Sequence, residues 1–395
     1  MKNVLRTGLF AASAGAILPL IVNCSGQPAA VKRKIAAEAK TNVQLPAESN
    51  GGDSTIQPGT PPNTQTVPPD PISSVGVPVL PTPPSEINPP DPSTEGDGDF
   101  ILNATYTVAP ETLEPAPKLR GSWIKFSMKA SDSKIFKGTD SYLKPMNPDF
   151  VRDSWLYLPV GYDGISELPF MVVGDGGWAT HQEILRNSID NLIHAKKIPP
   201  MALILVNPGT NDPAQGPNSQ RSWEYDSVND SFVTWIETEV IPRITKDYNV
   251  KLTNDPEGRA AMGGSSSGAM AFTMAWFRPD LYHRVYTYSG TFVNRITTPE
   301  HPYGAWDYPS FLIKDSEKKP IRVVLEAGEN DNLITARIYN DWLLANRTMA
   351  QVLKAKGYHY RFQYAPGAKH IDRRVQAQEM PNNLIWLWRG YPIPK

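Results

Sequence analysis

Three consecutive serines lie between glycines at residues 264–268, which read Gly-Ser-Ser-Ser-Gly. The preceding residues, 259–263, are apolar enough for a short buried strand, and residues 269–276 have the composition of a helix. A serine at a sharp strand-to-helix turn presents its Oγ as a nucleophile, and flanking glycines let neighbouring backbone approach without a Cβ clash. We therefore interpret the middle serine, Ser266, as a catalytic nucleophile.

Two other interpretations of this segment are less consistent with its surroundings. A flexible Gly/Ser linker is the first, but linkers are rarely flanked by two apolar secondary-structure elements. A phosphate-binding loop of the Walker type is the second, and it is excluded because no lysine follows Gly268. In the preferred interpretation the next amide, that of Ser267, opens the helix and can donate to an oxyanion.

A nucleophilic serine needs a base, which in this arrangement follows it in the chain. His370 comes from a loop directly after the last predicted strand, 360–364, which is where the base belongs. His359 lies at the start of that strand beside polar positions, which favours a solvated role. The two remaining downstream histidines precede every plausible acid; they are His283 and His301. His370 is therefore the predicted base.

The acid is expected after the predicted strand 321–325, where the loop carries several carboxylates. Asp331 lies beyond the turn glycine, where it could hold the His370 ring in its working tautomer. Glu329 is the alternative acid, and Glu326 is expected to lie still on the strand. The loop after an earlier strand, residues 174–177, is rich in glycine and is expected to supply a second oxyanion donor, a plain glycine turn being the alternative.

Short apolar runs alternate with longer amphipathic stretches over the second part of the chain. This alternation predicts an α/β fold with a mostly parallel sheet covered by helices on both faces, and reactive groups at the carboxyl ends of its strands. The other strands are expected at 154–159, 169–173 and 201–206, and helices at 184–193, 232–244, 339–353 and 383–388.

The first 23 residues predict a signal peptide, because Lys2 and Arg6 precede an apolar run that is too short for a membrane span. Cys24 follows that run and is the only cysteine of the chain, so no intramolecular disulfide can form. Its position resembles a bacterial lipobox, which implies a lipidated lipoprotein cysteine anchored to the membrane. Ser25 in place of aspartate favours the outer membrane or cell surface. An ordinary cleaved signal with an incidental cysteine is the alternative.

Residues 24–117 are expected to form a disordered tether that acts as a spacer. Of the 39 prolines of the chain, 17 fall between Pro46 and Pro117, among Gly, Ser, Thr, Asn and Asp. The globular domain is therefore expected to span 118–395. The chain has a formal net charge of −1 and no basic stripe, so nucleic acid is not expected as a partner. The sequence carries no metal-binding motif, and no cofactor is expected.

The globular part resembles the esterase D and enterochelin esterase family of α/β-hydrolases, and within it the uncharacterised secreted putative esterases. The resemblance runs over about residues 126–391. The family includes feruloyl and acetylxylan esterases and mycolyltransferases. The stretches that carry the resemblance are 133–136, 174–177, 206–209, 221–226, 263–268, 328–332 and 386–389.

This resemblance implies the α/β-hydrolase fold, with a mostly parallel central sheet and helices on both faces. It implies Ser266 as nucleophile, Asp331 as acid and His370 as base, with the amides of Gly177 and Ser267 forming the oxyanion hole. Many relatives have Gly-Gly or Gly-His before the catalytic histidine. Residues 368–369 read Ala-Lys instead, which bears on the local loop shape and on the substrate.

Substrate-binding residues are expected in two places. Arg221, Glu224 and Tyr225 match a segment that lies near the site in relatives of this family. Trp178, and Trp306 on the aromatic insertion 290–319, are expected to form walls of the cleft, which would suit sugars or aromatic acyl groups.

The sequence therefore predicts an exported, lipid-anchored serine esterase that works through an acyl-enzyme on a small-molecule or carbohydrate ester. An acyltransferase of the same fold differs only in its acceptor and stays open. A non-catalytic surface-binding protein is the other alternative, and the presence of all three triad residue types argues against it. The oligomeric state is left open.

Overall fold

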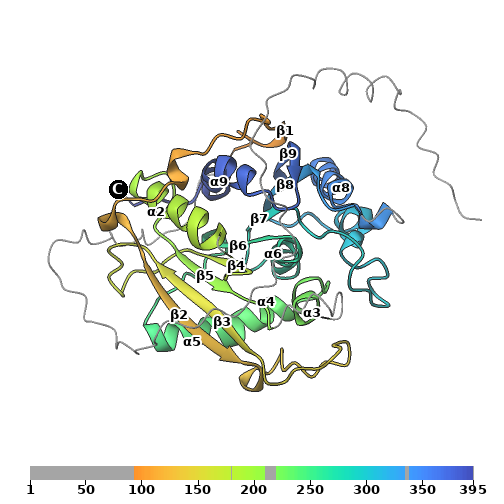
Figure 1. Ribbon diagram of the computed structural model, residues 1–395, viewed down its shortest axis with the longest axis horizontal. Helices are drawn as coiled ribbons and strands as arrows, with labels where there is room; N and C mark the ends of the chain where they lie inside the picture. The colour runs from red at the N-terminus through yellow and green to blue at the C-terminus, as the bar shows by residue number, and fades with distance from the viewer. Residues whose placement is uncertain (1–92, 179, 210–218, 334–337, 395) are drawn as a thin grey trace, which may run out of the picture. The chain divides into compact units, whose positions relative to one another are not determined.

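The computed structural model describes residues 93–178, 180–209, 219–333 and 338–394 (Figure 1). They build a nine-stranded sheet with the order β1-β9-β8-β7-β6-β4-β5-β3-β2. Strand β3 runs antiparallel to both of its neighbours, and every other neighbouring pair is parallel. The predicted mostly parallel sheet is confirmed.

The described strands include every strand expected from the sequence. They are β1 (Gly98–Ile101), β2 (Ser122–Lys129), β3 (Val151–Leu158), β4 (Phe170–Gly174), β5 (Ala202–Val206), β6 (Arg259–Gly264), β7 (Arg284–Tyr288), β8 (Arg322–Asn330) and β9 (His359–Lys369). The α-helices are α2 (Arg186–His194), α3 (Gln220–Tyr225), α4 (Ser231–Trp235), α5 (Ile241–Tyr248), α6 (Ser266–Phe277), α7 (Ile313–Asp315), α8 (Trp342–Ala355) and α9 (Arg373–Trp388). The strands that the sequence did not indicate are β1, β2 and β7.

The expected start of the globular domain at residue 118 is wrong. Strand β1 pairs in parallel with β9 at the edge of the sheet, and Leu102 and Tyr106 pack into a small apolar cluster with residues of β9 and α9. The backbone of β1 covers hydrogen-bonding groups of β9 that would otherwise form an open edge. The globular domain therefore includes β1, whereas the predicted signal peptide and Cys24 lie outside the described residues.

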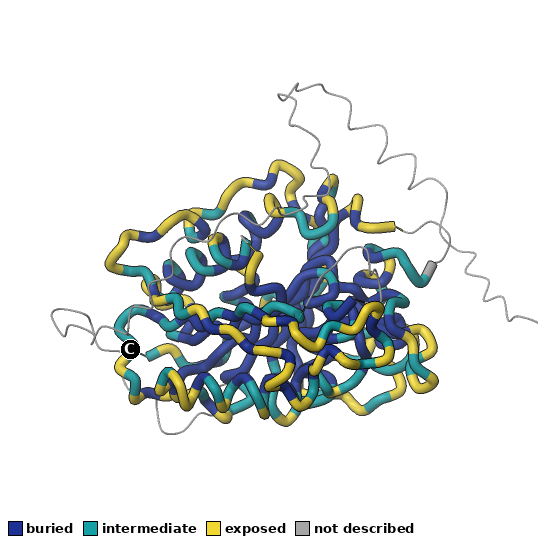
Figure 2. Tube along the Cα trace, turned by 60° about the horizontal axis from the view of Figure 1, so that its bottom comes forward, coloured by how far each residue is buried: buried dark blue, intermediate teal, exposed yellow. Residues whose placement is uncertain are grey.

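Side chains of each strand alternate between two apolar cores, one on each face of the sheet. On β4, Phe170 and Val172 belong to the core under α4, α5, α6 and α8, whereas Met171 and Val173 belong to the core under α2 and α9. Figure 1 shows these two groups of helices on opposite sides of the sheet, and Figure 2 shows the buried residues gathered in the interior. No described helix is long and apolar enough to cross a membrane.

Four neighbouring parallel strands end at one edge of this sheet. Strands β6, β7, β8 and β9 pair in sequence, so the residues that follow their last positions emerge side by side. Those residues are Ser265, Ser289, Asp331 and His370. The fold thus brings a serine, an aspartate and a histidine from distant parts of the chain to one edge.

Candidate active site

Ser265 occupies a strained turn between β6 and α6. Its φ of 56° and ψ of −126° lie in a region that non-glycine residues rarely adopt, at a cost of about 1–3 kcal/mol. The turn is fixed on both sides, because the Ser265 amide donates to the Tyr288 carbonyl and the Ser265 carbonyl accepts from the Ala269 amide. A Cβ on Gly264 would lie 2.2 Å from the Tyr288 ring, so this approach requires glycine. The result is a serine held at the sheet edge.

The Ser265, His370 and Asp331 side chains form a hydrogen-bonded series. The distance between Ser265 Oγ and His370 Nε2 is 2.9 Å, and that between His370 Nδ1 and Asp331 Oδ1 is 2.5 Å. An ionised carboxylate can only accept, so Nδ1 carries the ring proton and Nε2 accepts from the Ser265 hydroxyl. This is the arrangement in which a histidine can remove a serine proton.

The prediction that Ser266 faces the histidine is wrong. Ser266 is the first residue of α6, and its Oγ donates to Asp226 Oδ2 at 3.1 Å on the buried side of the turn. Strand β6 continues through Gly264, one residue further than the sequence indicated, so the turn falls on the first of the three serines. Ser265 therefore takes the place that was expected for Ser266.

The loop that carries His370 is held by the end of β7. The Ile371 amide donates to Ser289 Oγ at 3.0 Å, and the Ser289 amide donates to the Glu326 carbonyl at 2.7 Å. Ile371 and Ser289 both have positive φ values, as do Ser265 and Asp175, which follow β6 and β4. Four of the eight non-glycine residues with positive φ among the described residues therefore surround this site, as is common where strain fixes a functional geometry.

The alternative acids lie elsewhere. Glu329 is exposed and accepts from the Gly367 amide at 2.8 Å, so it stabilises the end of β9 and does not reach His370. Glu326 lies on β8, as expected, and is fully buried. Burial raises its pKa well above the usual glutamate value, and the nearby Asp331 carboxylate adds to that shift. Of the three acidic residues of this segment, the structure brings only Asp331 to His370.

The two predicted oxyanion donors are placed differently from expectation. Ser267 is fully buried, and its Oγ donates to the Gly264 carbonyl at 2.8 Å. Because the turn falls on Ser265, the next amide is that of Ser266, the first of α6, which has no acceptor within the helix. The Gly177 amide donates to Asn207 Oδ1 at 2.8 Å, so an oxyanion would have to replace that acceptor.

A cavity of about 310 Å³ lies beside the Ser265 hydroxyl. Its lining is mostly polar, with Trp342 and Leu333 as apolar elements. The lining residues are Arg221, Ser265, Ser266, Thr291, Arg295, Asn332, Leu333 and Trp342. Trp342 also packs its ring edge-on against His370, with ring centroids 6.0 Å apart, and its Nε1 donates to Thr291 Oγ1 at 3.1 Å.

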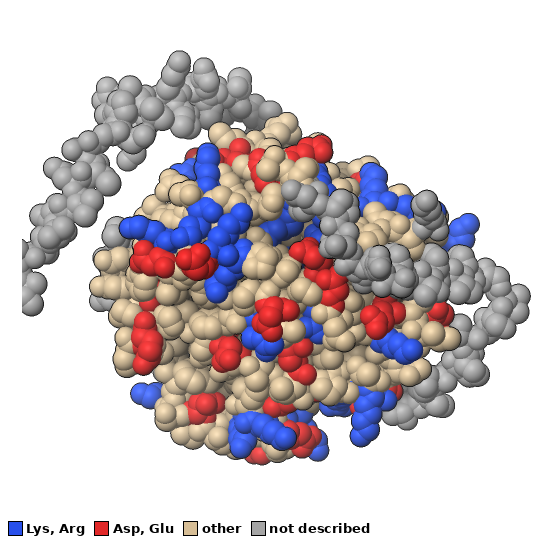
Figure 3. Space-filling model, turned by 180° about the vertical axis from the view of Figure 1, so that it is seen from behind, with Lys and Arg blue, Asp and Glu red and all other residues tan. Residues whose placement is uncertain are grey.

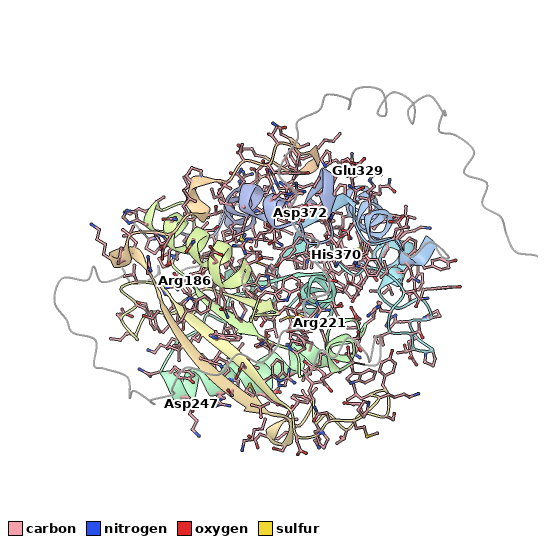
Figure 4. The ribbon with its side chains drawn as sticks, in the orientation of Figure 1. Arg186, Arg221, Asp247, Glu329, His370 and Asp372 are labelled. Carbon is pink, nitrogen blue, oxygen red and sulfur yellow. The ribbon has the colours of Figure 1, made fainter. Side chains whose placement is uncertain are left out.

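Of the expected substrate-binding residues, only Arg221 lines this cavity. Its Nε and Nη2 donate to the two oxygens of Asp175 at 2.9 and 2.7 Å. Burial alone would raise the pKa of Asp175, but the Arg221 guanidinium outweighs that effect and the pKa is lowered. Arg221 is therefore held rigidly by a charge partner. Figure 4 labels it together with His370 in the middle of the molecule.

The other expected substrate-binding residues do not line the cavity. Glu224 is buried in an ion pair with Arg152, at 2.6 and 2.9 Å. The Tyr225 hydroxyl is buried and donates to the Val206 carbonyl at 3.2 Å. Both residues hold α3 against the sheet and so help to fix the position of Arg221 on the same helix.

The aromatic residues expected as walls are also placed elsewhere. Trp306 packs against Tyr339, with ring centroids 5.6 Å apart, and Trp178, 38% exposed, lies beside His181. Thr291, Arg295 and Trp342 line the cavity but were not predicted from the sequence. Thr291 and Arg295 lie just after β7, so recognition of that strand would have pointed to them. Where the chain is described, no group of three or more His, Cys, Asp or Glu side chains could hold a metal ion.

The chain matches a sequence model of the family described as "Putative esterase" over residues 152–383. This range begins on β3, ends within α9, and contains Ser265, Asp331 and His370. No match was found among curated proteins.

Two esterases of known structure have a similar fold. The first is a ferulic acid esterase from the anaerobic fungus Anaeromyces mucronatus, with 17% sequence identity, a TM-score of 0.51, and coverage of 73% of this chain and 98% of that one. The second is an enterochelin esterase from Shigella flexneri, with 18% identity, a TM-score of 0.50, and coverage of 70% of this chain and 60% of that one. These likenesses confirm the predicted α/β-hydrolase fold.

Proposed function

Because the chain belongs to the putative esterase family of α/β-hydrolases, we propose that it is a serine esterase that hydrolyses carboxylic esters through Ser265, His370 and Asp331. The observation that carries this proposal is the series of two hydrogen bonds, 2.9 and 2.5 Å, that joins the strained serine to the aspartate through the histidine.

The reaction follows from the roles that these contacts permit. Ser265 Oγ attacks the ester carbonyl carbon while its proton passes to His370 Nε2, and Asp331 Oδ1 stabilises the imidazolium that forms. The Ser266 amide, at the positive end of the twelve-residue helix α6, donates to the developing oxyanion. The Gly177 amide is the second donor once it exchanges Asn207 for the substrate oxygen.

Collapse of the tetrahedral intermediate expels the alcohol, which takes its proton from His370 Nε2. The product of this step is an ester between the substrate acyl group and Ser265 Oγ. Water then attacks that acyl group, with His370 accepting the water proton, and the second collapse returns the proton to Ser265. A carbohydrate-linked ester is one substrate class that fits this chemistry, and a small-molecule ester is another.

We also propose that the protein is exported and anchored through a lipid on Cys24. The support for this proposal is the charged and apolar pattern of the first 23 residues and the position of the single cysteine after it. Metabolic labelling with a fatty-acid analogue, compared between the wild type and Cys24→Ser, tests it. A wild-type protein that is unlabelled and found in the soluble fraction would refute the anchor.

The esterase proposal is tested by labelling with a fluorophosphonate, which reacts with activated serines, followed by mass spectrometry of the modified peptide. We expect the label on Ser265, loss of labelling in Ser265→Ala, and retained labelling in Ser266→Ala. Hydrolysis of 4-nitrophenyl butyrate should likewise be lost in Ser265→Ala and retained in Ser266→Ala. A protein that neither takes the label nor hydrolyses any ester of a short-chain panel would refute the proposal.

A further inference from the structure

We propose that Arg295 binds a carboxylate of the substrate, so that the preferred esters carry a negative charge a few carbon atoms from the scissile carbonyl. This inference rests on the proposed esterase function and names the substrate class of that site. Its basis is the difference between the two guanidinium groups that line the cavity beside Ser265.

The Arg221 charge is already paired. Asp175 accepts hydrogen bonds from two of its nitrogens in a bidentate pair. Such a pair neutralises the guanidinium charge and fixes its orientation. Arg221 therefore serves as a fixed part of the wall.

Arg295 is different, because its donors are largely unused. Its only hydrogen bond among the described residues is a long one, 3.4 Å from Nη2 to Ser222 Oγ. Its Nε finds no acceptor among them, and the nearest carboxylate oxygen, Asp226 Oδ2, is 3.9 Å away. A guanidinium carries five N–H donors, and leaving them unpaired in a partly buried position is unfavourable. The Arg295 side chain is 29% exposed, so a ligand in the cavity can reach it.

Asp226 compensates the Arg295 charge only weakly. Burial raises the pKa of this carboxyl, although the neighbouring Arg295 and Arg221 counteract the rise. Its Oδ2 already accepts from Ser266 Oγ, and its Oδ1 has no partner among the described side chains. The cavity wall is therefore left with a cationic group that is ready to bind an anion.

The position of Arg295 sets the distance of that anion from the reacting bond. The 3.1 Å contact of Ser266 Oγ and the 3.9 Å contact of Arg295 Nε share Asp226 Oδ2, so these two groups are at most about 7 Å apart. Ser266 directly follows the proposed nucleophile. Because Ser265, Ser266 and Arg295 line one cavity of about 310 Å³, a ligand in it can place its carboxylate against Arg295 at about 2.7–2.9 Å and its ester carbonyl at Ser265, with a few carbon atoms between them. Trp342 and Leu333 supply apolar surface for those carbons.

On the face seen in Figure 3, acidic and basic side chains are interspersed. The partner that the cavity fits is a small carboxylated ester.

The experiment compares kcat/KM for two matched pairs of esters on the full chain. 4-Nitrophenyl pentanoate and mono-4-nitrophenyl glutarate differ by a carboxylate on the acyl side. Phenyl butanoate and 4-carboxyphenyl butanoate differ by one on the alcohol side. We expect the wild type to favour the carboxylated member of one pair, and Arg295→Gln to reduce that preference roughly tenfold to a hundredfold, mainly through KM. Arg295→Lys should restore part of it.

Arg243→Gln is the matched control. Arg243 lies on α5, pairs with Asp247 at 3.4 Å, and does not line the cavity. Figure 4 labels Asp247 at the lower edge of the molecule, away from His370. This variant should keep the wild-type preference.

The proposal is overturned if the wild type favours the neutral member of both pairs, or if Arg295→Gln lowers both members of the preferred pair equally. A binding measurement separates this failure from failure of the esterase proposal. Calorimetry with Ser265→Ala should show glutarate binding more tightly than pentanoate, or 4-hydroxybenzoate more tightly than phenol, and Ser265→Ala/Arg295→Gln should lose that difference. Absence of both glutarate and 4-hydroxybenzoate binding to Ser265→Ala overturns the carboxylate site even if no ester is hydrolysed.

Discussion

Exchange of each of the first two serines for alanine separates two roles that the sequence could not distinguish. Ser265→Ala removes the hydroxyl that lies 2.9 Å from His370 Nε2. Losing the nucleophile of such a unit typically lowers turnover by about 10⁴–10⁶, which is about 5–8 kcal/mol of transition-state stabilisation. Ser266→Ala removes only a 3.1 Å hydrogen bond to Asp226 and leaves the Ser266 backbone amide in place.

Ser266→Ala is therefore expected to lower the unfolding free energy and to leave most of the activity. Asp226 Oδ1 already lacks a partner among the described side chains, so the substitution removes a hydrogen bond from a buried carboxyl. Such a loss costs about 1–3 kcal/mol of unfolding free energy. We expect at most a tenfold fall in kcat/KM for 4-nitrophenyl butyrate, together with a lower midpoint of denaturant unfolding.

A third variant tests the strain at the turn. Ser265→Gly should abolish activity but raise the unfolding free energy by about 1 kcal/mol, because glycine adopts a φ of 56° without a Cβ penalty. Hydrolysis and urea unfolding of the three variants should be measured on the same preparations. Retained activity in Ser265→Ala, with loss in Ser266→Ala, would refute the assignment of the nucleophile.

Four further predictions follow from individual groups. Asp331→Asn should lower kcat about 10⁴-fold because the amide cannot stabilise the imidazolium, whereas Glu329→Gln should have little effect; the opposite order in hydrolysis assays would show that the acid is Glu329. Burial lowers the pKa of His181 from 6.5 to about 4, so the unfolded chain takes up this proton first as the pH falls, and stability is lost between those values. His181→Gln should remove about 2 kcal/mol of that loss, as measured by urea unfolding at pH 7 and pH 4.5; an equal loss in both proteins would contradict this role. Burial raises the pKa of Glu326, so its contribution to stability falls as the pH rises above about 4.5. Glu326→Gln should therefore have a higher thermal midpoint than the wild type at pH 8, and a lower midpoint would contradict this reasoning. Cys24→Ser should move the protein to the soluble fraction with unchanged kcat/KM, because the proposed site lies entirely within the folded domain.

The sequence predicts the fold well wherever a strand is buried by apolar residues alone. Strand β4, for example, is buried at every position and was recognised from its composition. Strand β7 is equally buried but contains Arg284, whose Nε and Nη2 donate to Glu257 at 2.7 and 2.8 Å. Polar residues with buried partners hide a strand from a hydrophobicity pattern, because the partner is known only from the tertiary structure.

Chain order and strand ends locate His370 and Asp331, because each follows directly after a strand of the same parallel sheet. Substrate-contacting residues are harder to predict. Trp306 has the composition expected of a binding wall, yet it packs against a neighbouring aromatic ring. Glu224 lies in a segment near the site, yet its carboxylate neutralises Arg152 beneath it. Residue type alone cannot distinguish a side chain that faces the cavity from one that supports it.

The choice among the three serines depends on where β6 stops pairing. Gly264 pairs with Tyr288 in the last register position of β6 and β7, and the Ser265 amide then donates to the Tyr288 carbonyl before the chain turns. Ser267 completes this end of the strand, because its Oγ donates to the Gly264 carbonyl and accepts from the Gly264 amide. Gly268 serves another purpose, since a Cβ there would lie 3.1 Å from Gly290 Cα. The glycines that precede the turn are thus 263 and 264. Only the register of β6 against β7 decides that the turn falls on Ser265.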